Sequence, residues 1–96
     1  MQIYFIQQGS SDLIKIGCSK NVARRFRELQ TGSPHTFLLL GVMEGDRDKE
    51  KEIHTKFTHL RQKGEWFKLN HDLSSFISKN CEFDDLPILP QRRRKF

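Results

Sequence analysis

Four side chains have the chemistry needed to act together on a phosphate group. They are a phenol, an ammonium, a guanidinium and a carboxylate: Tyr4, Lys15, Arg25 and Glu50. A guanidinium can bind two phosphate oxygens at once, and a carboxylate can hold a divalent metal ion. A cation beside a phenol favours the phenolate and makes it a better proton acceptor. The question is whether the fold brings these four groups together.

A β-hairpin is expected to carry the phenol and the ammonium. Its strands are residues 2–7 and 12–17, rich in β-branched and aromatic types and joined by the turn sequence QGSS. With the turn centred between Gly9 and Ser10, Tyr4 lies directly opposite Lys15 and projects from the same face. By itself, Tyr4 is equally consistent with a half-buried strand residue, and Lys15 with an edge charge.

A short helix is expected to carry the guanidinium. Asn21 is a good N-cap. The apolar stripe is Val22, Phe26 and Leu29, and Thr31, Gly32 and Pro34 mark the end of the helix. At roughly 100° per residue, Arg25 lies about 65° from the centre of this stripe. Arg24 lies on the opposite side and Arg27 well out to the side, so Arg25 is expected to flank the sheet.

A second helix, residues 47–62, is expected to carry the carboxylate. Its apolar stripe is Ile53, Phe57 and Leu60, and Gly64 ends it. Glu50 then lies about 50° from the inward direction and His54 about 90° away. A favourable position near the helix N-terminus is an alternative reason for an acid at residue 50.

The remaining elements complete an α+β fold. A central, buried strand is expected at 36–44, a short extended piece at 65–69 and a helix at 71–80. The order is β-β-α-β-α, then a short strand and a last helix, which predicts a three-stranded antiparallel sheet flanked by helices. Residues 1–80 form the predicted domain, and 81–96 a loosely ordered, Pro-containing basic tail.

Composition narrows the class of protein. The 96 residues suit one domain, and no apolar run reaches the length of a membrane span. Without a signal peptide, the expected location is cytoplasmic. Of the formal charge of +5, residues 92–95 supply +4, and residues 1–36 carry +3 against −2 for residues 37–91. That asymmetry predicts a basic face of the kind that binds nucleic acid. Cys18 and Cys81 have neither disulfide-framework nor zinc-site spacing.

Several short motifs resemble the GIY-YIG nuclease superfamily. Gln2-Ile3-Tyr4 is similar to its Gly-Ile-Tyr motif, and Lys15-Ile16-Gly17 to its Tyr-Ile-Gly motif. GCSKNVARR places Arg25 where the family has its helical arginine, and EKEIHTKF places Glu50 where it has its metal-binding acid. ELQTGSP and GEWFKL resemble a compact branch that ends in a Gly-Glu-Trp-Phe motif. The likeness covers roughly residues 1–77.

The resemblance implies a Mg²⁺-dependent endonuclease that hydrolyses phosphodiester bonds in DNA. Glu50 would hold Mg²⁺, for which Mn²⁺ is a substitute, and Arg25 would bind the phosphate oxygens. Tyr4 would take a proton from the attacking water with help from Lys15, and His54 would orient the nucleophile or a phosphate. The implied nucleic-acid contacts are Lys15, Gly17, Lys20, Arg25, Arg92, Arg93 and Arg94.

Three departures from the family pattern leave alternatives open. Gln2 replaces the first glycine, Lys15 the second tyrosine, and Leu29 the usual His or Tyr, for which His54 is the expected substitute. One alternative is a catalytically inactive nucleic-acid-binding module of the same fold, and another is a protein-interaction factor. RNA remains a possible substrate, and a homodimer or a targeting partner a possible source of site selectivity. Glu65 and Trp66 are expected to serve structure rather than chemistry.

Overall fold

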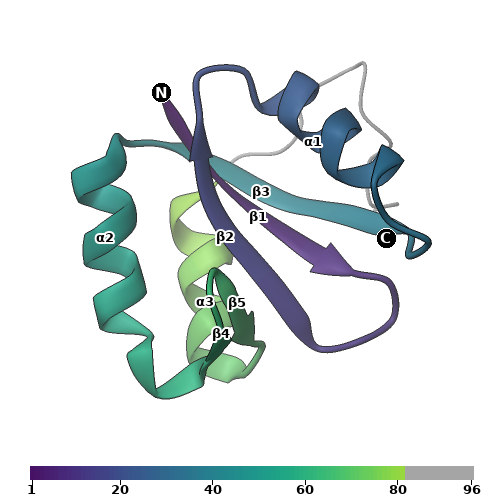
Figure 1. Cartoon of the computed structure of the whole chain (residues 1–96). Helices are drawn as coiled ribbons and strands as arrows, with labels where there is room; N and C mark the ends of the chain where they lie inside the picture. Colours follow the sequence, from purple (N-terminus) through teal and green to yellow (C-terminus); the bar gives the residue numbers. More distant parts are fainter. Residues whose placement is uncertain (82–96) are drawn as a thin grey trace, which may run out of the picture.

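A five-stranded antiparallel sheet forms the centre of the molecule, with helices on both faces (Figure 1). The computed structural model describes residues 1–81. The strands are β1 (Gln2–Gln8), β2 (Leu13–Ser19), β3 (Phe37–Glu44), β4 (Arg61–Lys63) and β5 (Trp66–Lys68), in the order β3-β1-β2-β5-β4. The helices are α1 (Val22–Thr31), α2 (Arg47–Lys56) and α3 (His71–Asn80), with a single 3₁₀ turn, η1 (Thr58–Leu60). The predicted α+β class is confirmed.

The sheet differs from the predicted one in size and order. It has five strands rather than three, because β4 and β5 form a hairpin that extends it beyond β2. The predicted helix 47–62 ends at Lys56, and its last part becomes η1 and β4. Phe57 and Leu60 are buried as expected, since a spacing of three suits a 3₁₀ turn as well as an α-helix. β3 is buried but lies at an edge of the sheet, not at its centre.

The register of the first hairpin differs from the predicted one by two residues. Tyr4 pairs with Gly17, and Lys15 pairs with Ile6. The reason is a longer turn, in which Gly9 adopts a left-handed φ of 55°. A shift of two residues keeps every side chain on its face. Tyr4 and Lys15 are therefore diagonal neighbours on one face, and the prediction of direct opposition is wrong.

The sheet separates two hydrophobic clusters. Ile3 and Phe5 of β1 face α2 and α3, and Tyr4 and Ile6 face α1. All four side chains are at most 2% exposed, so β1 is buried on both faces. The alternation places the candidate phenol on the α1 face of the sheet.

Each helix begins at a capped residue. Asn21, Asp46 and Asn70 each accept a hydrogen bond from the backbone N–H three residues on, at 2.9–3.1 Å. Such caps satisfy donors that the helix leaves free. The predicted boundaries of α3 are confirmed, and α1 ends at Thr31, one residue beyond its predicted end.

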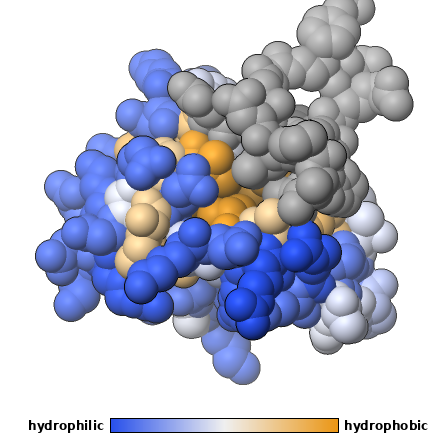
Figure 2. All heavy atoms as spheres, turned by 90° about the horizontal axis from the view of Figure 1, so that it is seen from above, coloured by the Kyte–Doolittle hydropathy of each residue, from blue (hydrophilic) through white to orange (hydrophobic). Residues whose placement is uncertain are grey.

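The face of the molecule drawn in Figure 2 is mainly hydrophilic over the described residues. Seen from above, hydrophobic side chains gather at the centre of this face and charged or polar ones surround them (Figure 2). Within residues 1–81, none of the helices has the length and hydrophobicity to cross a membrane. The predicted tail falls outside the described residues apart from Cys81.

Candidate active site

The Tyr4 ring lies across Gly17 on the neighbouring strand. A Cβ at residue 17 would overlap the hydroxyl and two ring carbons of Tyr4. The side chain of Tyr4 is 2% exposed. Packing against Tyr4 therefore explains the glycine at residue 17, since the phenol fills the space that a side chain there would occupy. The predicted contact between Gly17 and nucleic acid stays a prediction.

Arg25 contacts the Tyr4 hydroxyl from α1. This contact is the main cause of a raised pKa of Arg25, and it acts to lower the pKa of Tyr4. The Arg25 side chain is 43% exposed, against 72% for Arg24. Both arginines form ion pairs with Glu28, at 3.4 and 3.3 Å. The predicted difference between the two helix faces is confirmed, because Arg25 alone reaches the sheet.

The Tyr4 phenol is protonated at neutral pH. Its pKa is raised above the ordinary value of 10.0, chiefly because burial disfavours the phenolate, and the negative charges of Glu65 and Glu50 add to the effect. The opposing influence of Arg25 is smaller than that of burial. The expected help of Lys15 in favouring the phenolate is outweighed, because burial raises the pKa of Tyr4. The Tyr4 oxygen accepts from the Arg25 guanidinium and keeps its own proton.

Lys15 lies on the same face as Tyr4, and its side chain is 14% exposed. Its Nζ is 3.2 Å from Oε1 of Glu65 and 5.4 Å from the centre of the Trp66 ring. Sequence reasoning assigned Glu65 and Trp66 to structure alone. The missed signal is the pairing of β5 with β2, which places Trp66 directly opposite Lys15.

Glu50 is the one buried charged residue in the described part of the chain, at 7% exposed. Its carboxylate lies 3.8 Å from Nη1 of Arg47 and 3.9 Å from Nε2 of His54, both beyond hydrogen-bond distance. Burial raises the pKa of Glu50, and the nearby charge of Glu65 raises it further. His54, Arg47 and Lys15 act in the opposite direction. The predicted inward orientation of Glu50 is confirmed.

His54 fastens α2 to the edge of β2. Its Nε2 lies 2.9 Å from the backbone oxygen of Ile16, and its ring lies 5.0 Å from the Phe67 ring. A carbonyl oxygen only accepts, so Nε2 carries the proton. β5 pairs with β2 only as far as Lys15, and at the next residue, Ile16, the backbone oxygen is bonded by His54 instead. Its predicted role in orienting a nucleophile stays a prediction, with one nitrogen already engaged by the backbone.

The groups meet around the uncovered edge of β2. Tyr4 is contacted by Arg25 and lies in the field of Glu50, and Glu50 in turn lies in the field of Lys15. They do not share one pocket. A hollow of about 370 Å³ is lined by Arg47, Asp48, Glu50, Lys51, His54, Arg61 and Glu65. Tyr4, Lys15 and Arg25 lie outside that lining, on the α1 side of the sheet.

The other predicted contacts are not gathered at this edge. Lys20 is exposed between β2 and α1, and no ion pair is formed by it within residues 1–81. Arg92, Arg93 and Arg94 lie outside the described residues.

Glu50 suits a metal ion that takes few ligands from the protein. Over residues 1–81 there is no group of three His, Cys, Asp or Glu side chains placed to hold a metal. Mg²⁺ commonly takes one or two carboxylates and fills its remaining positions with water and substrate phosphate oxygens. A buried carboxylate that lacks a hydrogen bond and lines a hollow fits this mode.

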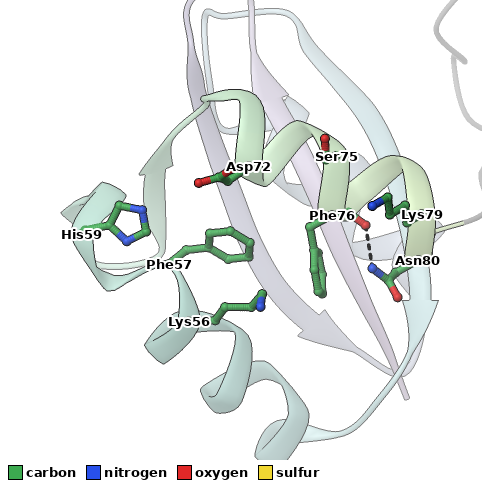
Figure 3. A pocket seen from close by; sticks show the side chains of 8 residues that line it. All are labelled: Lys56, Phe57, His59, Asp72, Ser75, Phe76, Lys79 and Asn80. Carbon is green, nitrogen blue, oxygen red and sulfur yellow. Dashed lines mark hydrogen bonds between the residues drawn. The ribbon is translucent and has the colours of Figure 1, made fainter.

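A second hollow lies away from these residues, between the end of α2 and α3 (Figure 3). It measures about 340 Å³ and is lined by Lys56, Phe57, His59, Asp72, Ser75, Phe76, Lys79 and Asn80. The Phe57 and Phe76 rings meet edge to face there, with centres 5.4 Å apart. None of its residues belongs to the candidate site.

The family model of the T5orf172 domain matches residues 1–81, which include every element from β1 to α3. The chain belongs to the T5orf172 domain family. This domain is found in endonuclease-related proteins. No curated protein and no solved structure matches the chain. Membership of the T5orf172 family agrees with a nuclease-related or DNA-binding module, and the GIY-YIG assignment stays a prediction.

Replacing Glu50 by Gln should stabilise this T5orf172 domain at neutral pH. A raised pKa in the folded state means that ionised Glu50 opposes folding. This penalty is absent at pH values well below the ordinary glutamate pKa of about 4.3, where the acid is protonated in both states. It grows as the pH rises from there toward the folded-state pKa and is complete above it. Urea unfolding should therefore give a higher midpoint for Glu50→Gln at pH 7 and no difference at low pH. Glu52→Gln is the control, because Glu52 is 70% exposed. A lower midpoint for Glu50→Gln at pH 7 would contradict the assigned burial.

Replacing Gly17 by Ala should destabilise the fold through Tyr4. Forcing a methyl group into the phenol should cost about 1–3 kcal/mol in the free energy of unfolding. The loss should shrink in a Tyr4→Leu background, so a double-mutant cycle should show coupling. Gly32→Ala is the control, since its Cβ would meet nothing closer than 3.7 Å. Equal losses in the two backgrounds would show that the phenol does not occupy this space.

Proposed function

We propose that the chain is a Mg²⁺-dependent endonuclease that hydrolyses phosphodiester bonds in DNA. The observation that carries the proposal is a buried Glu50 carboxylate that makes no hydrogen bond within residues 1–81 and has only long ion pairs, at 3.8 and 3.9 Å. It lies in electrostatic reach of a Tyr4 hydroxyl that Arg25 contacts. Burial of a charge that has only long ion pairs costs stability, so its presence favours a functional role. Membership of the T5orf172 family supports the same class.

Glu50 would hold the metal ion, with Mg²⁺ as the expected ion and Mn²⁺ as a substitute. A bound Mg²⁺ would act as a Lewis acid that stabilises the departing oxygen of the phosphodiester. Burial of Glu50 limits the water around the carboxylate, which strengthens its attraction for a cation. Arg47, 3.8 Å away, would have to give way or turn to the substrate phosphate.

Arg25 and Lys15 would neutralise the phosphate on the α1 side of the sheet. Arg25 is 43% exposed, so a phosphate can approach its donors while Tyr4 holds it in place. Paired guanidinium donors suit two non-bridging oxygens, and their effect grows as charge accumulates in the transition state. Lys15 adds a point charge from β2.

Tyr4 would position the attacking water rather than deprotonate it. Its raised pKa keeps the hydroxyl protonated at neutral pH, so Tyr4 can donate to the water or to a phosphate oxygen. The water adds to phosphorus as the bond to the departing 3′ oxygen breaks. The attacking water would pass its proton to solvent, and the departing 3′ oxygen would take a proton from solvent.

A nucleic-acid-binding module without catalysis is the second candidate. One observation favours it: the candidate residues do not share one cavity. Glu50 and His54 line the hollow, whereas Tyr4, Lys15 and Arg25 do not. The basic side chains near α1 would then bind DNA or RNA through phosphate alone.

Nicking of supercoiled plasmid separates the two candidates. Purified protein with Mg²⁺ should nick the plasmid, and EDTA should abolish the reaction. Glu50→Ala and Arg25→Ala should each lower the rate by about 10²–10³-fold, the range for removing one group that stabilises transition-state charge. Arg24→Ala is the matched control, because Arg24 also pairs with Glu28 but points away from Tyr4, and its rate should stay within about threefold.

Equal losses for Arg24→Ala and Arg25→Ala would discredit the site. The binding module would be favoured if the wild type does not nick the plasmid and Glu50→Ala still binds DNA with an affinity that falls as the salt concentration rises.

A further inference from the structure

The Gly-Glu-Trp-Phe turn is fastened to β2 next to Lys15. Gly64 adopts a left-handed φ of 56°, which lets β4 return directly into β5. The backbone N–H of Ile16 donates to the backbone oxygen of Glu65 at 3.0 Å. Trp66 pairs with Lys15 across the two strands. These contacts bring the side chains of residues 65 and 66 to the same lysine.

Two different interactions hold the Lys15 ammonium. A carboxylate oxygen of Glu65 lies 3.2 Å from Nζ, and the centre of the Trp66 ring lies 5.4 Å from it. Both are attractive, one as an ion pair and one as a cation–π contact. An ammonium has three donors, so one ion pair leaves others for a further oxygen.

This lysine is more enclosed than the others that form ion pairs in the described residues. Its side chain is 14% exposed, whereas Lys49 is 42% and Lys68 is 60% exposed in their pairs with Glu52 and Asp12. A strand lysine without a function would place its charge in water. Lys15 instead keeps its charge beside the face that carries Tyr4.

We propose that Glu65 and Trp66 are positioning residues that hold the Lys15 ammonium ready for a phosphate oxygen of the substrate. The inference rests on the proposed function, since it assigns a new role within the same site. Lys15 touches the substrate, and Glu65 and Trp66 act through it. A purely structural reading, in which the pair only joins β5 to β2, predicts a loss of stability without an effect specific to Lys15.

The single tryptophan and the proposed contact give a direct optical test. Trp66 is the only tryptophan, so intrinsic fluorescence reports on the cation above its ring. A duplex DNA oligonucleotide is titrated in EDTA, which prevents cleavage, and fluorescence anisotropy of an end label measures binding in parallel. The wild type should change its Trp66 emission as DNA binds. Lys15→Gln should bind at least threefold more weakly and lose most of the emission change.

The outcomes of this titration separate the two proposals. Binding with the same emission change and affinity in Lys15→Gln would overturn the role of Lys15 while leaving the proposed function intact. No binding of DNA by the wild type would overturn both. Lys68→Gln is the control for a general effect of lost positive charge. It removes an equal charge from the neighbouring strand and should leave the emission change of Trp66 in place.

A double-mutant cycle tests whether Glu65 acts through Lys15. Glu65→Gln should lower the nicking rate by about tenfold, and in a Lys15→Gln background it should have no further effect. Asp12→Asn is the control, because it breaks an exposed pair across the same two strands and should leave the rate unchanged. Urea unfolding of each variant shows whether a lower nicking rate is caused by a loss of stability. The same tenfold loss in both backgrounds would overturn the positioning role of Glu65.

Discussion

The Tyr4 ring occupies the space that a side chain at residue 17 would fill, and the rest of the site depends on this contact. It fits only one register of β1 against β2, because the phenol needs a glycine opposite it. It places the hydroxyl beside the part of β2 that β5 does not pair with. Arg25 reaches that hydroxyl from α1, and the charge of Glu50 reaches it from α2. Two helices that lie against opposite faces of the sheet therefore act on one group.

The site is built at a cost in stability. Glu50 is buried, makes no hydrogen bond with the described residues, and has a second negative charge near it in Glu65. Such an arrangement opposes folding and favours the arrival of cations. His54 compensates locally, because it gives the backbone oxygen of Ile16 a partner where the sheet lacks one. The edge of β2 is thus closed by a helix, which leaves room beside it for a ligand.

Local patterns in the sequence predicted the helices and their orientation well. Asn21 was identified as the cap of α1, the apolar spacing separated Arg25 from Arg24, and Glu50 was expected to turn inward. These features depend on residues within one or two turns of each other. The periodicity of a helix is therefore enough to predict which of its side chains face the sheet.

Features that depend on distant pairing were not predictable in the same way. The register of the first hairpin depends on the length of the turn at Gly9. The hairpin of β4 and β5 could not be predicted, because the position of Leu60 fits a 3₁₀ turn as well as a continued α-helix. The raised pKa of Tyr4 depends on burial by two layers of structure, which no local pattern reveals. Membership of the T5orf172 family does not supply these details either.

The central claim is that Arg25 contacts the Tyr4 hydroxyl from α1 while the charge of Glu50, on α2, also influences it. Tyr4 is the only tyrosine, so alkaline titration of the protein by ultraviolet absorbance measures its pKa alone. Glu50→Gln removes a negative charge and should lower the pKa of Tyr4, whereas Arg25→Gln removes a positive contact and should raise it. Glu52→Gln should leave it unchanged. A pKa of Tyr4 that moves in neither variant would contradict the account.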